Sequence, residues 1–193
     1  MDEPFPGFSD YPRVITPPAI EDERLALRCL LGEPAAFDEL IARWHGGIWR
    51  YARRMTGRDD DADEVVQDVW LRVVRGLPKL QEPARIRAWI FGIARRVLMD
   101  RLRARYTSPT IADIELDTIG HAPAEDDDLR LRIGEMEAAL AALPVIERDV
   151  LALFYLDELS IAEVAAVAGV PVGTVKSRLF RARQLLRASM NQD

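Results

Sequence analysis

Polar and basic side chains recur near the carboxyl end of the chain at a spacing suited to recognising duplex DNA. With about 100° between successive residues of a helix, four of them share one face: Ser177, Phe180, Arg181 and Gln184. Guanidinium and amide groups can pair with base edges in the major groove, and an aromatic ring can contact a thymine methyl group. The opposite face is apolar: Val175, Leu179, Ala182 and Leu186. This helix is therefore expected to pack on a core and to present its polar face to DNA.

Phe180 separates this hypothesis from the alternative, an ordinary helical hairpin. A purely structural helix rarely places a bare aromatic ring among Arg and Gln on its solvent side. Lys176 and Arg181 are expected to reach guanine edges or phosphates, whereas Arg178 contacts phosphates or is merely solvated. The candidate DNA-binding residues of this helix are Thr174, Lys176, Ser177, Arg178, Phe180, Arg181 and Gln184.

The residues before this helix predict the element that positions it. Ser160 and Glu163 have the spacing of a capping box, which opens a short helix. Gly169 is expected to close that helix, and Pro171 to start the next one. A short helix, a glycine turn and a longer basic helix are the layout of a helix-turn-helix, whose second helix enters the major groove.

A second basic helix is predicted in the middle of the chain, over about residues 83–105. Between Arg85 and Arg105 the sequence holds seven arginines and one acid. One face of this helix carries Gly92 and the candidate DNA-binding residues Arg95, Arg96, Met99 and Arg103. Guanidinium groups around an adaptable apolar side chain suit unstacked single-stranded bases, although a solvated Arg-rich face is the alternative. Trp89 and Phe91 are possible stacking platforms, but Trp89 lies on the apolar stripe and is assigned to the core.

The helix predicted over residues 62–77 has an unusual polar face. A leucine there is surrounded by carboxylate, amide and guanidinium groups, which resembles a small protein-binding patch. The candidate residues are Glu64, Gln67, Asp68, Leu71 and, at the margin, Arg72. The preceding acids Asp59, Asp61 and Asp63 suggest helix capping rather than calcium binding, because the glycine and the closing glutamate of a calcium loop are missing.

Composition limits the other classes of function. With one cysteine and two histidines, the 193-residue chain can form neither an internal disulfide nor a four-ligand zinc site. We find no nucleophile with a base, no glycine-rich phosphate loop and no paired carboxylates, so we expect neither an enzyme, nor a metal site, nor a cofactor. No apolar run is long enough for a membrane span, and we expect a cytoplasmic protein without membrane insertion.

Charge is segregated along the sequence, and this segregation predicts the domain organisation. The net charge of −6 argues against DNA binding only as an average, because seven acids and no Lys or Arg lie between Thr107 and Asp128. The periodicity predicts an all-α protein with two small helical domains, at 21–105 and 129–190. They are joined by a flexible acidic linker at 106–128 and preceded by a disordered, proline-bearing extension at 1–20.

Both predicted domains resemble regions of the sigma-70 family, specifically the extracytoplasmic-function (ECF) sigma factors. The segments AFDELIARW, DADEVVQDVWLRV and RAWIFGIARRVLMDRLR look like sigma region 2. The segment LPVIERDVLALFYLDELSIAEVAAVAGVPVGTVKSRLFRARQLL looks like sigma region 4, and its GTVKSRLFRAR stretch is highly specific. The resemblance covers roughly seven tenths of the chain, with both regions in order.

This resemblance implies an alternative sigma factor that joins core RNA polymerase and starts transcription at promoter DNA. Region 2 would bind the beta-prime clamp helices through the patch around Leu71, and would melt the minus-10 element with Arg95, Arg96, Met99 and Arg103. Region 4, with its helix-turn-helix, would read the minus-35 element and contact the beta flap. Many relatives carry Asn where this chain has Arg96, so their minus-10 preference does not transfer. An anti-sigma factor is the expected regulator.

Two rival functions remain open from the sequence. One is a helix-turn-helix regulator that binds duplex DNA without joining polymerase, which leaves the patch around Leu71 unexplained. The other is a helical adaptor that binds only proteins, using its basic faces against acidic partners.

Overall fold

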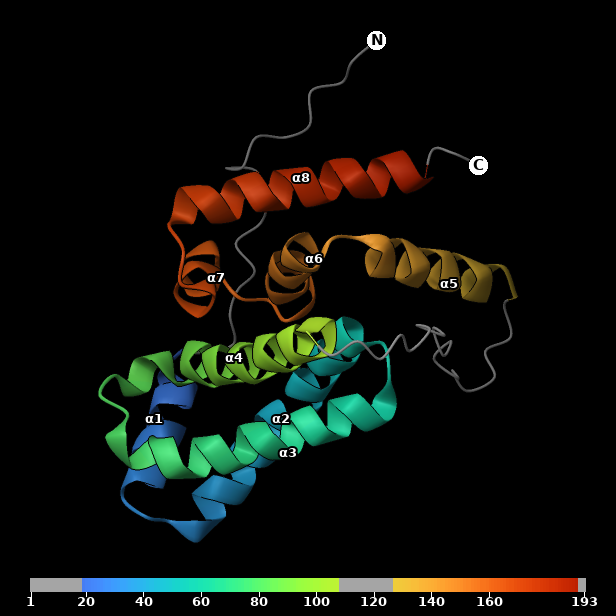
Figure 1. Ribbon diagram of the computed structural model, residues 1–193. Coiled ribbons are helices and arrows are strands. Elements are labelled where there is room, and N and C mark those ends of the chain that lie inside the picture. The colour runs from blue at the N-terminus through green and yellow to red at the C-terminus, as the bar shows by residue number, and fades with distance from the viewer. Residues whose placement is uncertain (1–18, 108–126, 191–193) are drawn as a thin grey trace.

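The structure is a computed structural model that describes residues 19–107 and 127–190 (Figure 1). The N-terminal bundle comprises α1 (Ala19–Leu30), α2 (Pro34–Thr56), α3 (Asp59–Gly76), the 3-10 turns η1 (Leu77–Lys79) and η2 (Pro83–Arg85), and α4 (Ile86–Thr107). The C-terminal bundle comprises α5 (Asp127–Ala142), α6 (Val145–Leu151), the π-helical turn η3 (Ala152–Leu156), α7 (Ile161–Ala168) and α8 (Val172–Met190). The described residues form no strand, and the all-α prediction is confirmed.

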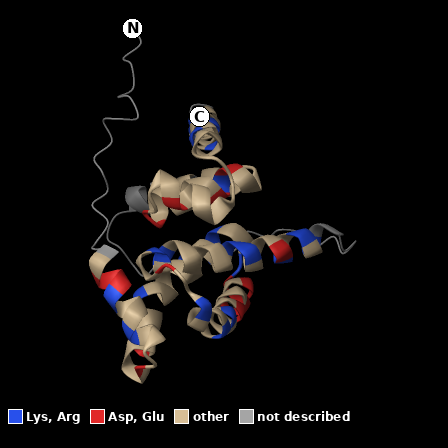
Figure 2. Cartoon of the chain, turned by 90° about the vertical axis from the view of Figure 1, so that its left-hand side faces the viewer, with Lys and Arg blue, Asp and Glu red and all other residues tan. Residues whose placement is uncertain are grey.

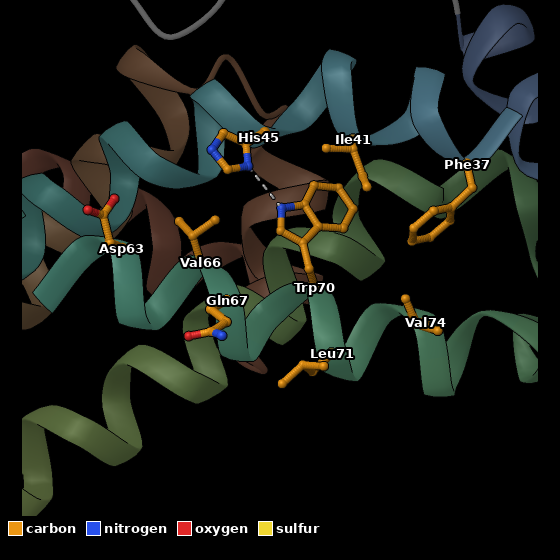
Figure 3. A pocket seen from close by; sticks show the side chains of 9 residues that line it. All are labelled: Phe37, Ile41, His45, Asp63, Val66, Gln67, Trp70, Leu71 and Val74. Carbon is orange, nitrogen blue, oxygen red and sulfur yellow. Dashed lines mark hydrogen bonds between the residues drawn. The ribbon is translucent and has the colours of Figure 1, made fainter. Parts of the chain in front are cut away.

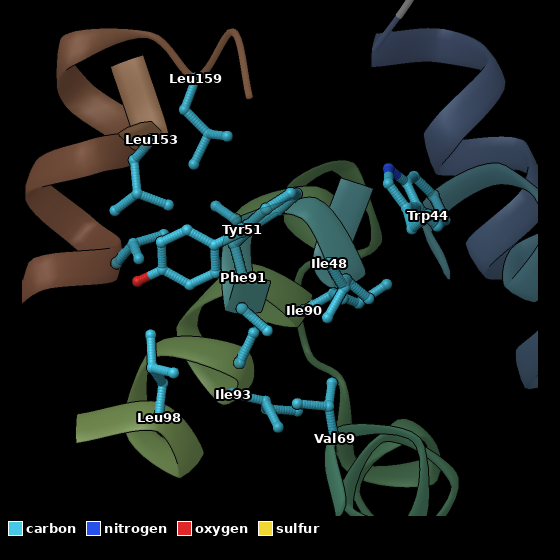
Figure 4. Packing of buried hydrophobic residues seen from close by; sticks show 14 of the residues in the cluster. Trp44, Ile48, Tyr51, Val69, Ile90, Phe91, Ile93, Leu98, Leu153 and Leu159 are labelled. Carbon is cyan, nitrogen blue, oxygen red and sulfur yellow. The ribbon is translucent and has the colours of Figure 1, made fainter. Parts of the chain in front are cut away.

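Local sequence sets the ends of the helices in the N-terminal bundle. Gly57 ends α2 in the left-handed conformation, with φ 79°, and its amide donates to the Arg53 carbonyl. Three aspartates then occupy the first turn of α3, where carboxylates meet the positive end of the helix dipole. The apolar faces of α2, α3 and α4 meet in a core that includes Ile48, Val69 and Ile90 (Figure 4).

The predicted helix-turn-helix is present in the C-terminal bundle. Glu163 donates its amide to the Ser160 hydroxyl at 3.2 Å and accepts the Ser160 amide at 2.8 Å, so the capping box forms. Gly169 closes α7 with φ 66°, a conformation that favours glycine. Three residues later, at Val172, α8 begins, and it lies along the outer side of α6 and α7 (Figure 1).

Several predicted boundaries shift by a few residues. The first helix begins at Ala19 rather than near residue 21, and the fourth runs to Thr107. The fifth begins at Asp127, so helices enter the predicted linker from both ends. The rest of the linker, residues 108–126, and most of the predicted extension, residues 1–18, lie outside the described residues.

The two bundles pack against each other, which the sequence did not predict. α6 and α7 lie over α4 (Figure 1), and α7 packs against α4. Leu153 and Leu159 from the C-terminal bundle belong to the same buried apolar cluster as Tyr51 and Phe91 from the N-terminal bundle (Figure 4). The hydrophobic contact between the bundles is therefore continuous with the core of the N-terminal bundle.

Candidate nucleic-acid interface

The polar face of α8 is exposed to solvent, as predicted. Val175, Leu179 and Ala182 are buried against the C-terminal bundle. On the other side the ring of Phe180 remains 57% exposed, next to the exposed side chain of Arg181. Lys176, Ser177 and Gln184 are also exposed, whereas Thr174 and Arg178 are half-buried. The Ser177 hydroxyl donates to the Thr174 carbonyl at 2.9 Å, so its oxygen faces solvent as an acceptor.

Arg181 has a partner that the sequence interpretation missed. The Glu147 Oε1 atom lies 3.5 Å from the Arg181 Nε atom, and the Glu147 side chain is largely buried. Glu147 belongs to α6, 34 positions earlier in the chain, so no helical periodicity could have paired the two residues. The Arg181 side chain nevertheless remains 68% exposed, so its guanidinium is still accessible to a ligand.

On α4 the four candidate DNA-binding residues are not equally exposed. Arg96 and Arg103 are exposed, and in Figure 2 the ribbon is coloured blue at the Lys and Arg positions, which recur along α4 and α8. Arg95 is not exposed in the same way: its side chain is 19% exposed, and its Nε atom donates to the Asp149 carboxylate at 2.7 Å. Met99 is half-buried against the apolar core. In this arrangement the four residues do not form one open face, because the C-terminal bundle holds Arg95, and their minus-10 role stays a prediction.

The neighbouring aromatic side chains serve packing. Phe91 is buried and meets Tyr51 edge to face, with ring centroids 6.1 Å apart. Trp89 packs against the core and lies so close to Gly76 that a Cβ atom there would approach the ring to 3.0 Å. The stacking role considered for Phe91 is therefore wrong in this arrangement, and the core assignment of Trp89 is confirmed. Gly92 has open space at its Cβ position, which leaves the backbone of α4 approachable.

A shallow apolar groove of about 380 Å³ runs between α2 and α3 (Figure 3). We call it the Trp70 groove. It is lined by Phe37, Ile41, His45, Asp63, Val66, Gln67, Trp70, Leu71 and Val74. Trp70 is half-buried, and its indole nitrogen donates to His45 Nδ1 at 3.3 Å. The indole therefore forms the floor of the groove instead of filling the interior.

The predicted protein-binding patch on α3, Glu64, Gln67, Asp68, Leu71 and Arg72, borders this groove through two of its members, Gln67 and Leu71. Leu71 is 49% exposed, so its predicted outward position is confirmed. Arg101 of α4 organises the acidic members, since its guanidinium donates to Glu64 at 2.6 Å and to Asp68 at 3.0 Å. These hydrogen bonds raise the pKa of Arg101. The sequence contained Arg101 in the basic helix but gave no sign of this cross-helix pairing.

The acidic side chains at the start of α3 accept hydrogen bonds from neighbouring helices. Asp61 accepts from Arg105 at 2.9 Å, and Asp63 accepts from the Trp49 indole at 2.7 Å. Asp59 accepts from Arg53. Within residues 19–107 and 127–190, no group of His, Cys, Asp and Glu side chains is arranged to hold a metal ion. Across the same described residues, no helix combines the length and apolarity needed to span a membrane.

Comparison with known proteins identifies both bundles. Residues 40–107 match the family described as Sigma-70 region 2, and residues 133–186 match Sigma-70, region 4. The ECF RNA polymerase sigma factor SigC of Mycobacterium tuberculosis is 32% identical, over 93% of this chain and 98% of that protein. The chain belongs to the ECF sigma factors of the sigma-70 family. It is thus an alternative sigma factor, a transcription initiation factor, and the two bundles are its regions 2 and 4.

The structural comparison extends this similarity to the pair of bundles. The RNA polymerase sigma factor CnrH of Cupriavidus metallidurans is 31% identical, over 91% of this chain and 97% of that protein. A solved structure of CnrH in complex with the cytosolic domain of CnrY has 28% identity and a TM-score of 0.69. That match covers 89% of this sigma factor and 98% of the CnrH chain, so it includes both bundles.

Proposed function

We propose that the sigma factor divides its promoter contacts between α8, which reads the minus-35 duplex, and α4, which binds the melted minus-10 strand. In this proposal residues 21–105 form region 2, which makes the minus-10 contacts, and residues 129–190 form region 4, which makes the minus-35 contacts. The observation that carries it is α8, where one face is buried in the C-terminal bundle and the other presents Phe180 and Arg181 to solvent. That arrangement suits insertion into the major groove, because the core contacts hold the helix while its polar face stays free.

The minus-35 contacts divide by chemistry. Arg181 and Lys176 supply the cations that can reach guanine edges, and Phe180 supplies an apolar surface for a thymine methyl group. Gln184 and Ser177 can form further hydrogen bonds with the bases, while Thr174 and Arg178 lie at the half-buried margin, closer to the phosphates. Region 4 would also contact the beta flap of the polymerase.

The minus-10 contacts begin at Arg96 and Arg103, which are open on α4. Arg96 Nε donates to the Gly92 carbonyl at 3.2 Å, which holds its guanidinium over the stretch of backbone that has no Cβ cover. Arg95 and Met99 join this surface once the C-terminal bundle moves away. Replacing Arg96 by Asn should change the base preference at minus-10 without unfolding α4, because the side chain is exposed.

The Leu71 residue and its neighbours in the Trp70 groove form the proposed binding surface for the beta-prime clamp helices. An apolar floor with a charged rim suits an amphipathic helix from the partner. Arg101 keeps Glu64 and Asp68 in place, so the rim is ordered before the partner arrives.

Anti-sigma control is proposed from CnrH, which has been solved in complex with the cytosolic domain of CnrY. The present structure matches that CnrH chain across both bundles. An anti-sigma factor that engages both regions would therefore find them already side by side in this chain.

The experiment uses purified core polymerase, this sigma factor and promoter DNA. We expect specific transcripts with the wild-type chain, and no co-purification with polymerase for Leu71→Asp, although the variant stays folded. Leu31→Asp is the matched control, because Leu31 is 79% exposed at the end of α1 and away from the groove. If no promoter is transcribed while the chain alone shifts duplex DNA, it acts as a regulator that never joins polymerase, and the proposal is wrong.

A further inference from the structure

A histidine lines the Trp70 groove together with the indole that forms its floor. His45 of α2 is exposed, Trp70 of α3 is half-buried, and the indole Nε1 atom donates to His45 Nδ1 at 3.3 Å. The indole also meets the Phe37 ring edge to face, with the ring centroids 6.3 Å apart, and Figure 3 shows it between His45 and Phe37. One ring contact and one hydrogen bond therefore hold the floor of the groove in place.

The hydrogen bond requires the neutral form of His45. Nδ1 accepts a hydrogen bond only when it carries no hydrogen, so the neutral ring has its hydrogen on Nε2. Protonation converts Nδ1 into a donor, and two N–H groups that face each other cannot form a hydrogen bond. Imidazole is the side chain that ordinarily changes its charge between about pH 5 and 8, so this bond is made and broken near neutral pH.

A carboxylate of the same groove attracts the charged form of the ring. Asp63 of α3 lines the groove, and Figure 3 shows His45 with the indole on one side and Asp63 on the other. Asp63 Oδ1 accepts from the Trp49 indole at 2.7 Å, but a carboxylate can accept several hydrogen bonds. Protonated His45 is therefore repelled by the indole N–H group and attracted toward Asp63.

Other charged groups around α2 pair with residues other than His45. These pairs are Glu21 and Asp22 of α1 with Arg43, Asp59 of α3 with Arg53, Arg95 of α4 with Asp149 of α6, and Asp157, after η3, with Arg54. On α2 itself, the Arg50 guanidinium lies beside Gly46, the residue that follows His45. Asp63 is therefore the carboxylate through which α3 acts on the imidazole.

We propose that His45 is a positioning residue for polymerase binding, which holds the Trp70 indole as the floor of the groove when neutral and releases it when protonated. The inference rests on the proposed role of this groove as the binding surface for the clamp helices. A floor that is ordered in advance loses less conformational entropy when the partner binds. A charged imidazole also adds a cation to an apolar lining, and its desolvation opposes burial under the partner. Acidification therefore weakens polymerase binding through this side chain.

The first measurement follows the indole N–H signals of the full-length chain by nuclear magnetic resonance, from about pH 8 to about pH 5. Trp70→Phe identifies the Trp70 signal among those of the four tryptophans. We expect this signal to follow the same pH curve as the ring signals of His45. His45→Asn should abolish the response, because its side-chain oxygen provides an acceptor that does not titrate. A Trp70 signal that ignores the titration of the His45 ring would overturn the proposal.

The second measurement is the affinity of the full-length chain for purified core polymerase at both ends of this pH range. On acidification the wild type should lose about fivefold more affinity than His45→Asn. His45→Phe, which keeps a ring but has no acceptor, should bind about fivefold more weakly already at the basic end and show no additional loss. Asp157, whose pKa burial raises to about 7, is present in every variant, so its contribution cancels in the comparison.

His121→Asn is the matched control, because it makes the same change at the other histidine of the chain, which lies outside the described residues. It should retain the wild-type pH profile, and circular dichroism checks that every variant keeps its helices. Equal pH profiles for the wild type and His45→Asn would overturn the positioning role. A wild type that binds no polymerase at any pH, while its Trp70 signal still follows His45, would instead overturn the proposed function of the groove.

Discussion

The two candidate DNA-binding helices differ in what covers them. In α8 the core side chains face the bundle and Phe180 faces solvent, so its candidate DNA-binding face is exposed. In α4 only part of the corresponding surface is open, because Asp149 of the other bundle holds Arg95. A helix can therefore carry candidate DNA-binding residues in a regular pattern while another part of the chain covers them. Availability depends on contacts from a distant part of the sequence.

The largest effect is expected on the open helix. Lys176→Ala combined with Arg181→Ala should weaken minus-35 duplex binding by about 1–3 kcal/mol for each base that the variant no longer recognises. Fluorescence anisotropy with holoenzyme and labelled duplex measures the change, with Ser189→Ala on the same helix as control. An unchanged affinity would mean that α8 does not read the duplex, and the contrast with α4 would disappear.

The contact between the bundles should make stability depend on pH through Asp157, whose side chain is 1% exposed between the bundles. Burial raises its pKa to about 7, opposed by the neighbouring Arg54, Arg50 and Arg87. The docked state therefore binds a proton more tightly than the unfolded chain. The protonated Asp157 carboxyl therefore contributes to the free energy of unfolding at low pH. This contribution is lost as the pH rises from about 4 to about 7, at up to roughly 1.4 kcal/mol per pH unit.

Asp157→Asn should flatten this pH dependence, because the amide cannot ionise. Urea unfolding at pH 5, 6, 7 and 8 provides the free energies of unfolding. A wild-type free energy that rises with pH across this range would show that Asp157 is ionised and paired in the docked state, contrary to its predicted neutrality.

The smallest effect is expected at Glu147, which pairs with Arg181 at 3.5 Å. Since the Arg181 side chain is 68% exposed, the pair is largely screened by solvent. Glu147→Gln removes an anion that competes with DNA for Arg181, so minus-35 binding should strengthen by about 0.5 kcal/mol or less. A clear loss of affinity would instead show that Glu147 orients Arg181 for the duplex.

The sequence predicted the parts of the molecule that depend on local pattern. The capping box at Ser160, the turn at Gly169 and the two faces of α8 follow from spacing within a few residues, and all three are present. The outward position of Leu71 follows from the same helical periodicity.

The sequence could not reveal contacts between distant segments. Asp149 looks like an ordinary polar residue on a short helix, and nothing near it in sequence indicates that Tyr51, 98 positions earlier, will bury it. Periodicity assigned Arg95 to the polar face of α4 correctly, but it does not show which polar faces another bundle covers. Nor does periodicity show that the indole of Trp70 borders an open groove.

The most direct measurement compares two DNA ligands on the free, full-length chain. The affinities for minus-35 duplex and for forked minus-10 DNA are determined for the wild type and for Asp149→Asn at one salt concentration. We expect the substitution to strengthen fork binding by about tenfold and to leave duplex binding unchanged, because Asp149 holds Arg95 of α4. Equal changes for both ligands, or no change for either, would contradict it.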